Sequence, residues 1–376
     1  MRRTILAVLA LLVLAGCQKA PEPPQQTQSV PQPKTVSFLA AGDDLIHGLI
    51  YESGRQEDGS YDFRPMYARV KPQIEAADVA VINQETVCGG SELGLSSYPA
   101  FNSPYEILDA LADAGVDWIT TSTNHAFDFG EQAILNQLGH VRENYPQMMV
   151  TGTHDSAEDA KTMRVLQRNG VRIGLLSYTY GLNGLSLPEG KEYLVDLIDE
   201  EKIAADVASL SEVSDIQIVG MHWGTEYQFA PDDRQRELAQ WLSDQGVDVI
   251  IGTHPHVLQP IQMITGEKGN ETLVFYSLGN FVSAQDVNSR MLGAMAKWNM
   301  IYDPQDGHVA IEDVRVEPTV MFFDAAGKNV QVYPLSQYDD ETASRHLLSL
   351  QGEDMSVSFF HDLCAQIMGE WMEDEE

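Results

Sequence analysis

Residues 247–256 have the sequence Val-Asp-Val-Ile-Ile-Gly-Thr-His-Pro-His, an apolar run that ends in two histidines. A short apolar run followed by glycine and proline is typical of a buried strand. Five more apolar runs end in similar polar, punctuated loops, at residues 36–41, 79–82, 118–123, 216–221 and 273–276. Because loops at the carboxyl ends of strands build the binding crevice of an open α/β sheet, the pattern predicts a site at such an edge.

Predicted helices alternate with these strands. Residues 103–115 begin with Ser103-Pro104 and end at Gly115, and residues 231–246 repeat this arrangement of start and stop signals. After Phe281 we expect antiparallel strands at 309–316, 319–323 and 330–333, and acidic C-terminal helices at 341–376. Strands that alternate with helices indicate an α/β fold in which helices are layered on sheets.

The N-terminus predicts export. Two arginines and the apolar residues 5–15 precede Leu14-Ala15-Gly16-Cys17, which is the pattern of a secretory signal. The apolar run is too short for a transmembrane helix, which needs about 20 residues. Cys17 in this context resembles the lipidated cysteine of a bacterial lipobox, and the alternative is an ordinary cleaved signal. We therefore expect a signal peptide at 1–16, a Pro/Gln-rich tether at 17–34, and a lipid-anchored protein at the outer face of a bacterial cell membrane.

The composition limits the class of partner. The formal net charge is -33, from 56 Asp and Glu against 23 Lys and Arg, and loss of Arg2 and Arg3 with the signal would make it -35 (-33 minus 2). Such a charge excludes nucleic acid as an expected partner and attracts cations. Cys88 and Cys364 are the cysteines that remain after Cys17, and the sequence leaves open whether they form a disulfide.

The side chains that follow the strands are of metal-binding types. They are Asp43, Glu85, Asn124, His222, His254 and His256. Carboxylate and amide oxygens with imidazole nitrogens suit divalent Zn, Fe, Ni or Mn. Pro255 is expected to hold its segment extended, so that the two flanking histidines serve two neighbouring ions. Two adjacent metal ions can activate a water and clamp both oxygens of a phosphoryl displacement.

Other polar residues near these positions have possible roles in catalysis. His125 directly follows Asn124 and is placed to protonate a leaving group, and Asp128 could orient its imidazole. His47 and Asn280 are possible additional ligands. Each assignment has a simpler alternative: Asp43 could cap a turn, and Glu85, His47 and Asn280 could be ordinary loop residues.

Six sequence blocks in order resemble a known family. They are GDDLIH (42–47), NQET (83–86), TNHAFDFG (123–130), MHWGTEY (221–227), GTHPHVLQP (252–260) and YSLGNFV (276–282). Together they resemble the bacterial CapA proteins of poly-γ-glutamate capsule synthesis, which are similar to calcineurin-like metallophosphatases. The resemblance implies a four-layer α/β/β/α sandwich, over residues 35–340, with a dinuclear metal centre.

The resemblance also implies a division of the ligands. Asp43, Glu85 and His256 would hold one ion, and Glu85, Asn124, His222 and His254 the other. The chain departs from the metallophosphatase pattern at Leu45, where a histidine is usual, and at Glu85, where the bridging residue is usually aspartate. One ion could therefore be weakly held, or His47 could reach into the site.

Two functions are expected from these observations. The first is a surface-anchored CapA-like protein with a metal-dependent hydrolase pocket, acting on a phosphoester or on an amide of an anionic polymer. The alternative is a lipoprotein that binds the polymer or assists its assembly without turnover. The implied partners are the capsule polymer or its precursor, membrane-bound poly-γ-glutamate synthase subunits, and the membrane itself through the lipid anchor.

Overall fold

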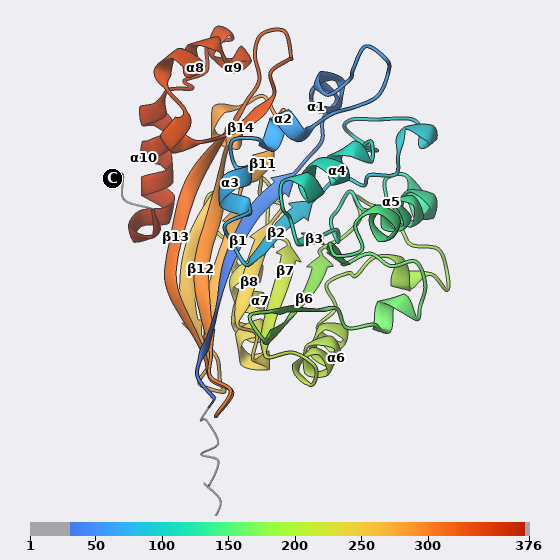
Figure 1. The fold of residues 1–376 in the computed structure, drawn as a ribbon, viewed down its shortest axis with the longest axis vertical. Helices are drawn as coiled ribbons and strands as arrows, with labels where there is room; N and C mark the ends of the chain where they lie inside the picture. Colours follow the sequence, from blue (N-terminus) through green and yellow to red (C-terminus); the bar gives the residue numbers. More distant parts are fainter. Residues whose placement is uncertain (1–30, 373–376) are drawn as a thin grey trace, which may run out of the picture. The chain divides into compact units, whose positions relative to one another are not determined.

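Two β-sheets stack face to face, with helices on both outer faces (Figure 1). The structure, a computed structural model, describes residues 31–372, and residues 32–372 belong to one compact unit. The predicted signal peptide and Cys17 lie outside the described residues. Phe38 of one sheet stacks on Trp298 beside it, and Trp298 contacts Phe275 of the other sheet, with ring centroids 5.2 Å apart in both pairs. The predicted four-layer α/β/β/α sandwich is confirmed.

The eight-stranded sheet has the order β14-β13-β12-β1-β2-β3-β4, with β11 beside β1. Its strands are β1 (Lys34–Asp44), β2 (Val79–Gln84), β3 (Trp118–Thr120), β4 (Met149–Thr151), β11 (Asn280–Val282), β12 (Leu292–Tyr302), β13 (Val309–Phe322) and β14 (Gln331–Pro334). Strands β1 to β4 are parallel, whereas β12, β13 and β14 are antiparallel.

The six-stranded sheet has the order β5-β6-β7-β8-β10-β9. Its strands are β5 (Val165–Arg168), β6 (Val171–Thr179), β7 (Ile216–His222), β8 (Val249–Thr253), β9 (Leu258–Thr265) and β10 (Glu271–Leu278). The four central strands are parallel and the two edge strands antiparallel. All six predicted runs are strands, and they divide evenly between the sheets: β1, β2 and β3 in one, and β7, β8 and β10 in the other.

The helices cover the outer faces. They are α1 (Gly48–Ser53), α2 (Arg64–Tyr67), α3 (Lys71–Ile74), α4 (Glu106–Asp113), α5 (Gly130–Asn144), α6 (Glu200–Ser211), α7 (Asp233–Gln245), α8 (Asp340–Arg345), α9 (Leu347–Leu350) and α10 (Val357–Met368). α6 and α7 pack a second apolar cluster against the six-stranded sheet, and α10 packs against β9 and β13. No helix within residues 31–372 is long and apolar enough to span a bilayer.

Local sequence signals predicted both helices, but the start of each differs in the structure. α7 begins at Asp233 and not at Pro231, because a capping box joins Asp232 and Gln235, and its C-terminal glycine is Gly246 as predicted, with φ 98°. The expected cap of α4 at Ser103 is wrong, because the Ser103 amide donates to Val87 O and the helix begins at Glu106.

Three further expectations can be compared with the structure. The strands expected at 309–316 and 319–323 are one continuous strand, β13. The acidic C-terminal region contains the helices α8, α9 and α10, as predicted. Cys88 and Cys364 are both buried and free, which answers the question that the sequence left open.

Candidate metal centre

A β-bulge at Gly42 aims Asp43 into the site. Ala41 pairs with Ile82, but Asp43 pairs with Asn83, so β1 has an extra residue at this point. A Cβ at Gly42 would lie 1.9 Å from the carbonyl oxygen of Gly279, so only glycine fits here. Asp43 is fully buried, and its Oδ1 accepts a hydrogen bond of 2.9 Å from Asn83 Nδ2. The carboxylate is thus held at the carboxyl end of β1.

The loop after β8 turns sharply at both of its histidines. His254 has φ 95° and His256 has φ 58°, so the expectation of an extended segment around Pro255 is wrong. Residues other than glycine rarely adopt positive φ, and such strain costs about 1–3 kcal/mol per residue. The His254 amide nitrogen donates to Asp43, 3.2 Å from either carboxylate oxygen. The turn therefore brings both imidazoles over the end of β1.

Two groups of possible ligands share Glu85. Asp43, Glu85 and His256 form one group, and Glu85, His222 and His254 form the other, with the ligand atoms of each group within 4.8 Å of one another. Glu85 Oε1 lies 3.6 Å from His256 Nε2 and 3.8 Å from His222 Nε2. Apart from Asn124, these are the two sets that the family resemblance implied. Metal binding by these residues stays a prediction.

Neighbouring side chains orient the imidazoles. His256 Nδ1 lies 3.0 Å from Asn280 Oδ1 and 3.2 Å from Asp43 Oδ2, so it donates and leaves Nε2 toward Glu85. His222 Nε2 lies 2.9 Å from Asn124 Oδ1. Such outer hydrogen bonds are the usual way in which a protein fixes a metal-ligating histidine. Asn280 therefore contacts the site through His256, and Asn124 through His222.

The chemistry of the donors fits a cation. Both oxygens of Glu85 and the Nδ1 atom of His254 are buried and have no hydrogen-bond partner within the described residues. An unsatisfied buried polar atom costs about 1–3 kcal/mol, so native structures avoid it unless another group fills the role. Carboxylate oxygens and imidazole nitrogens in this arrangement suit divalent transition metals.

Burial and neighbouring charges shift the pKa values of several groups in this site. Burial raises the pKa of Glu85 well above its ordinary value, and burial with the nearby His256 lowers the pKa of His254 to about 3. For His256, burial lowers the pKa, but the carboxylates of Glu85 and Asp43 outweigh burial and raise it to about 9. A proton held on Glu85 or on His256 is one that a bound cation would displace.

The candidate acid lies beside the ligand groups. His125 Nδ1 is 2.7 Å from Asp128 Oδ2, and the same oxygen accepts from the Phe101 amide at 2.7 Å. Phe101 also packs edge-on against the imidazole, with ring centroids 4.7 Å apart. Asp128 therefore fixes the ring so that Nε2 is the nitrogen left for other contacts.

His47 does not lie among the possible metal ligands, where it was considered as an additional one. Its Nδ1 accepts a hydrogen bond of 3.2 Å from the Ala284 amide, and it is in none of the ligand groups found within residues 31–372. Burial lowers its pKa to about 4. His47 thus supports the loop after β11, and no other histidine takes the place that Leu45 leaves in the family pattern.

Sequence reasoning missed three residues of this site. Glu226 forms a third possible ligand group with His254 and His256, and it is exposed at the rim. Tyr180 packs on His254, with ring centroids 4.6 Å apart, and Asn183 accepts from Asn124 Nδ2 at 3.2 Å. Glu226 lay within a quoted block, four residues after His222. Tyr180 and Asn183 follow β6, a strand that was not predicted.

Comparison with protein families identifies the chain. The family described as bacterial capsule synthesis protein PGA_cap matches residues 37–285, and a prokaryotic membrane lipoprotein lipid attachment site matches residues 1–18. The protein belongs to the bacterial capsule synthesis family and carries a lipoprotein attachment motif. The expected membership of the CapA group is confirmed.

Two curated relatives are similar over part of their length. The PGA biosynthesis protein CapA of Bacillus subtilis is 34% identical over 206 residues, which are 52% of this chain and 50% of that protein. The capsule biosynthesis protein CapA of Bacillus anthracis is 26% identical over 213 residues, 56% of this chain and 49% of that protein. The chain thus spans about half the length of these relatives.

Solved structures of similar shape include two proteins described by an activity. A phosphatase from Mycoplasma pneumoniae has a TM-score of 0.48 and 14% identity, over 77% of this chain and 95% of that one. A 5'-nucleotidase precursor from Thermus thermophilus has a TM-score of 0.46 and 15% identity, over 76% of this chain and 54% of that one. Likeness at this level supports no statement about activity.

Proposed function

We propose that this protein is a lipid-anchored component of poly-γ-glutamate capsule synthesis, outside the cytoplasm, whose buried centre is a metal-dependent hydrolase site. One observation carries the proposal: Glu85 is shared by two groups of possible ligands, and neither of its oxygens has a hydrogen-bond partner among residues 31–372. The family membership supports the capsule role, and the attachment motif supports the anchor.

The roles of the residues follow from their positions. Asp43, Glu85 and His256 would hold one divalent ion and Glu85, His222 and His254 a second, with Asn124 beside His222. When bound, such a pair of ions activates water and polarises the scissile bond. Each ion would be Mn, Fe, Zn or Ni.

His125 would protonate the leaving group, and Asp128 would orient His125. Asp128 holds the imidazole at 2.7 Å and orients it, so His125 can give a proton from Nε2 to the departing oxygen or nitrogen. Glu226 adds negative charge at the rim, and the substrate must therefore approach with a neutral or cation-paired group next to it. An amide of an anionic polymer is neutral and meets this condition, and a phosphoester meets it when its charge is paired with a cation.

Elemental analysis tests the proposal directly. The soluble form beginning at Gln18 is expected to hold about two transition-metal equivalents. A His254→Ala/His256→Ala variant should lose them, whereas His361→Ala, which changes an exposed histidine, should not. Turnover of phosphodiester and γ-glutamyl probes should follow the metal content. A folded double variant that keeps its metal and its turnover would refute the assignment.

A second function is supported by Leu45 and His47. Because Leu45 stands where the pattern has a histidine and His47 is hydrogen-bonded to Ala284, the ion at Asp43 would have few protein ligands. A weakly held ion favours a protein that binds the polymer or assists the membrane synthase without turnover. In that case a His125→Ala variant would restore the capsule of a deletion strain. Failure of this well-folded variant would favour the hydrolase.

A further inference from the structure

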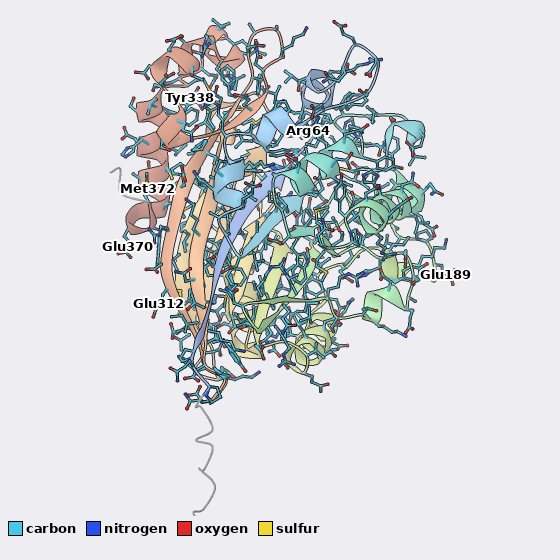
Figure 2. All side chains as sticks on the ribbon, in the orientation of Figure 1. Arg64, Glu189, Glu312, Tyr338, Glu370 and Met372 are labelled. Carbon is cyan, nitrogen blue, oxygen red and sulfur yellow. The ribbon has the colours of Figure 1, made fainter. Side chains whose placement is uncertain are left out.

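Glu226 differs from the other exposed carboxylates of this acidic protein. The formal charge of the chain is -33, and exposed glutamates such as Glu189 and Glu312 lie on its surface (Figure 2). Among the described residues, Glu226 is the exposed carboxylate that belongs to a possible ligand group, and its partners are His254 and His256. The ligand atoms of these three side chains lie within 4.8 Å of one another.

Two backbone hydrogen bonds bring Glu226 to the histidines. They tie the loop after β7 to the loop after β8: the Trp223 amide donates to Thr253 O at 3.1 Å, and the Tyr227 amide donates to Pro255 O at 2.7 Å. Tyr227 has φ 64°, a conformation that residues other than glycine rarely adopt. Glu226 directly precedes Tyr227, and Pro255 lies between the two histidines, so this pairing sets the position of the carboxylate.

Side chains from the loop after β11 hold Tyr227 in place. The guanidinium carbon of Arg290 lies 3.5 Å from the centroid of the Tyr227 ring, and Gln285 Nε2 donates to the Tyr227 hydroxyl at 3.4 Å. Gln285 Oε1 also accepts from Asn280 Nδ2 at 3.1 Å, and Asn280 Oδ1 lies 3.0 Å from His256 Nδ1. One network of side chains therefore supports both His256 and the loop after β7.

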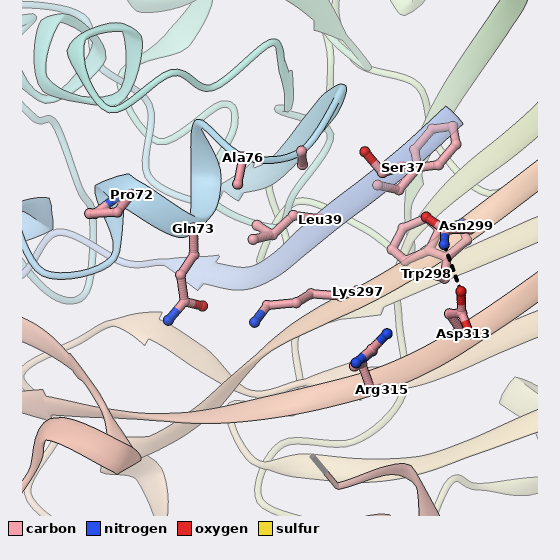
Figure 3. A pocket seen from close by; sticks show the side chains of 12 residues that line it. Ser37, Leu39, Pro72, Gln73, Ala76, Lys297, Trp298, Asn299, Asp313 and Arg315 are labelled. Carbon is pink, nitrogen blue, oxygen red and sulfur yellow. Dashed lines mark hydrogen bonds between the residues drawn. The ribbon is translucent and has the colours of Figure 1, made fainter. Parts of the chain in front are cut away.

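No basic side chain of the described chain forms an ion pair with Glu226. Arg290, the cation beside Tyr227, lies 3.6 Å from Asp286 instead. Lys297 and Arg315 line a separate cavity of about 380 Å³ beside α3 (Figure 3), and this cavity shares no residue with the ligand groups found within residues 31–372. A cation at Glu226 must therefore come from solvent.

The donor set around Glu226 suits a divalent metal ion. Two histidines and one carboxylate are a usual set of protein ligands at a metal site that keeps a position open. His254 and His256 are 3% and 2% exposed, and His254 Nδ1 is buried without a hydrogen-bond partner in the part of the chain that the structure describes. The two inner groups offer only three side chains each, so a further carboxylate oxygen can add to the coordination of either ion.

We propose that Glu226 is a further metal ligand, which binds a divalent transition metal together with His254 and His256 on the solvent side of the centre. The inference rests on the metal centre of the proposed function and deepens it. Because the same two histidines belong to the inner groups, Glu226 adds a ligand to that centre and does not form a separate site. Asp43 and Glu85 are fully buried, so a cation that enters from solvent meets Glu226 first.

Titration of the metal-free protein with Co²⁺ measures the role of Glu226. The chain begins at Gln18 and is stripped of metal with a chelator; the wild type should bind about two equivalents. Glu226→Gln should weaken at least one equivalent about tenfold or more, since loss of even a group that only orients a ligand costs about 10- to 100-fold. The visible absorption bands of the bound Co²⁺ should also change, because they depend on the ligands.

Asp286→Asn is the matched control. Asp286 is an exposed carboxylate next to Gln285, and it is in none of the ligand groups found within residues 31–372. This variant should keep the affinity and the spectrum of the wild type. A carboxylate that only attracts cations acts through a field that salt screens, over about 3 Å at 1 M. The effect of Glu226→Gln should therefore persist at high salt if Glu226 is a ligand.

The possible results separate this inference from the proposed function. Equal affinity and equal spectra in wild type and folded Glu226→Gln would overturn the role of Glu226 and leave the metal centre standing. An effect that disappears at high salt, or that Asp286→Asn reproduces, would also overturn it, because charge alone would then explain the result. A wild type that binds no metal would overturn the centre itself and this inference with it.

Discussion

Glu85→Gln should have opposite effects on stability with and without metal. The substitution keeps the size of the side chain and removes the charge that both ligand groups share. Without metal, the buried carboxyl keeps its proton to a higher pH in the folded chain than in the unfolded chain, because burial raises its pKa well above the ordinary 4.5. A raised pKa of an acid means that folding stability falls as the pH rises above the ordinary value.

The magnitude follows from the pH. Each pH unit between 4.5 and the folded pKa costs the chelated wild type about 1.4 kcal/mol, so the cost is larger at pH 7 than at pH 5. A glutamine is neutral throughout and avoids this cost. With metal at a thousandfold excess over its Kd, the wild type gains about 4 kcal/mol, and Glu85→Gln gains much less.

Urea unfolding at pH 5 and pH 7, with chelator or with Mn²⁺ or Zn²⁺, measures both effects. In chelator, Glu85→Gln should be more stable than wild type at pH 7, and the difference should shrink to below about 1 kcal/mol at pH 5. In metal, the wild type should be the more stable protein. Glu143→Gln, an exposed substitution on α5, is the control. Equal stabilisation of wild type and Glu85→Gln by metal would refute the role of Glu85.

Three more predictions follow from the geometry. His125→Ala should lower turnover about 10²-fold or more with metal content unchanged, as measured by single-turnover kinetics with elemental analysis. For His154, burial lowers the pKa, but the nearby carboxylates of Asp159 and Asp196 outweigh burial and raise it. Its stabilisation should be full below pH 6.5 and lost as the pH rises through the folded pKa, so His154→Gln should destabilise the protein more at pH 6 than at pH 9 in urea unfolding. Native protein beginning at Gln18 should not react with a thiol reagent until it is unfolded, because Cys88 and Cys364 are buried and burial raises both thiol pKa values.

Each of these expectations has a result that would contradict it. Unchanged turnover in His125→Ala would remove the imidazole from the reaction. An equal loss of stability in His154→Gln at both pH values would mean that the ion pairs of this histidine contribute nothing. Rapid labelling of the native protein would show that at least one of the two thiols is accessible through local opening.

The six strands that were predicted share a local property, which is why the sequence alone determined them. Each is a short apolar run ended by glycine or by a polar residue, as in residues 247–253, and such a run forms a buried strand wherever it packs. β6 was missed although it is almost wholly buried, and with it the loop that carries Tyr180 and Asn183. β12 was also missed, although most of its residues are buried.

The sequence by itself determined which residue types follow the strands, the order of the family blocks and the N-terminal motif. Only the tertiary structure decided which of those residues meet. Glu85 lies between the two ligand groups, and His47 is turned to a backbone amide although the sequence placed both near the site. The physical reason is that the local pattern of apolar and polar residues sets where a strand ends. The direction in which each side chain points depends instead on bulges, positive φ angles and long-range pairing between strands. Those features arise only when the two sheets stack.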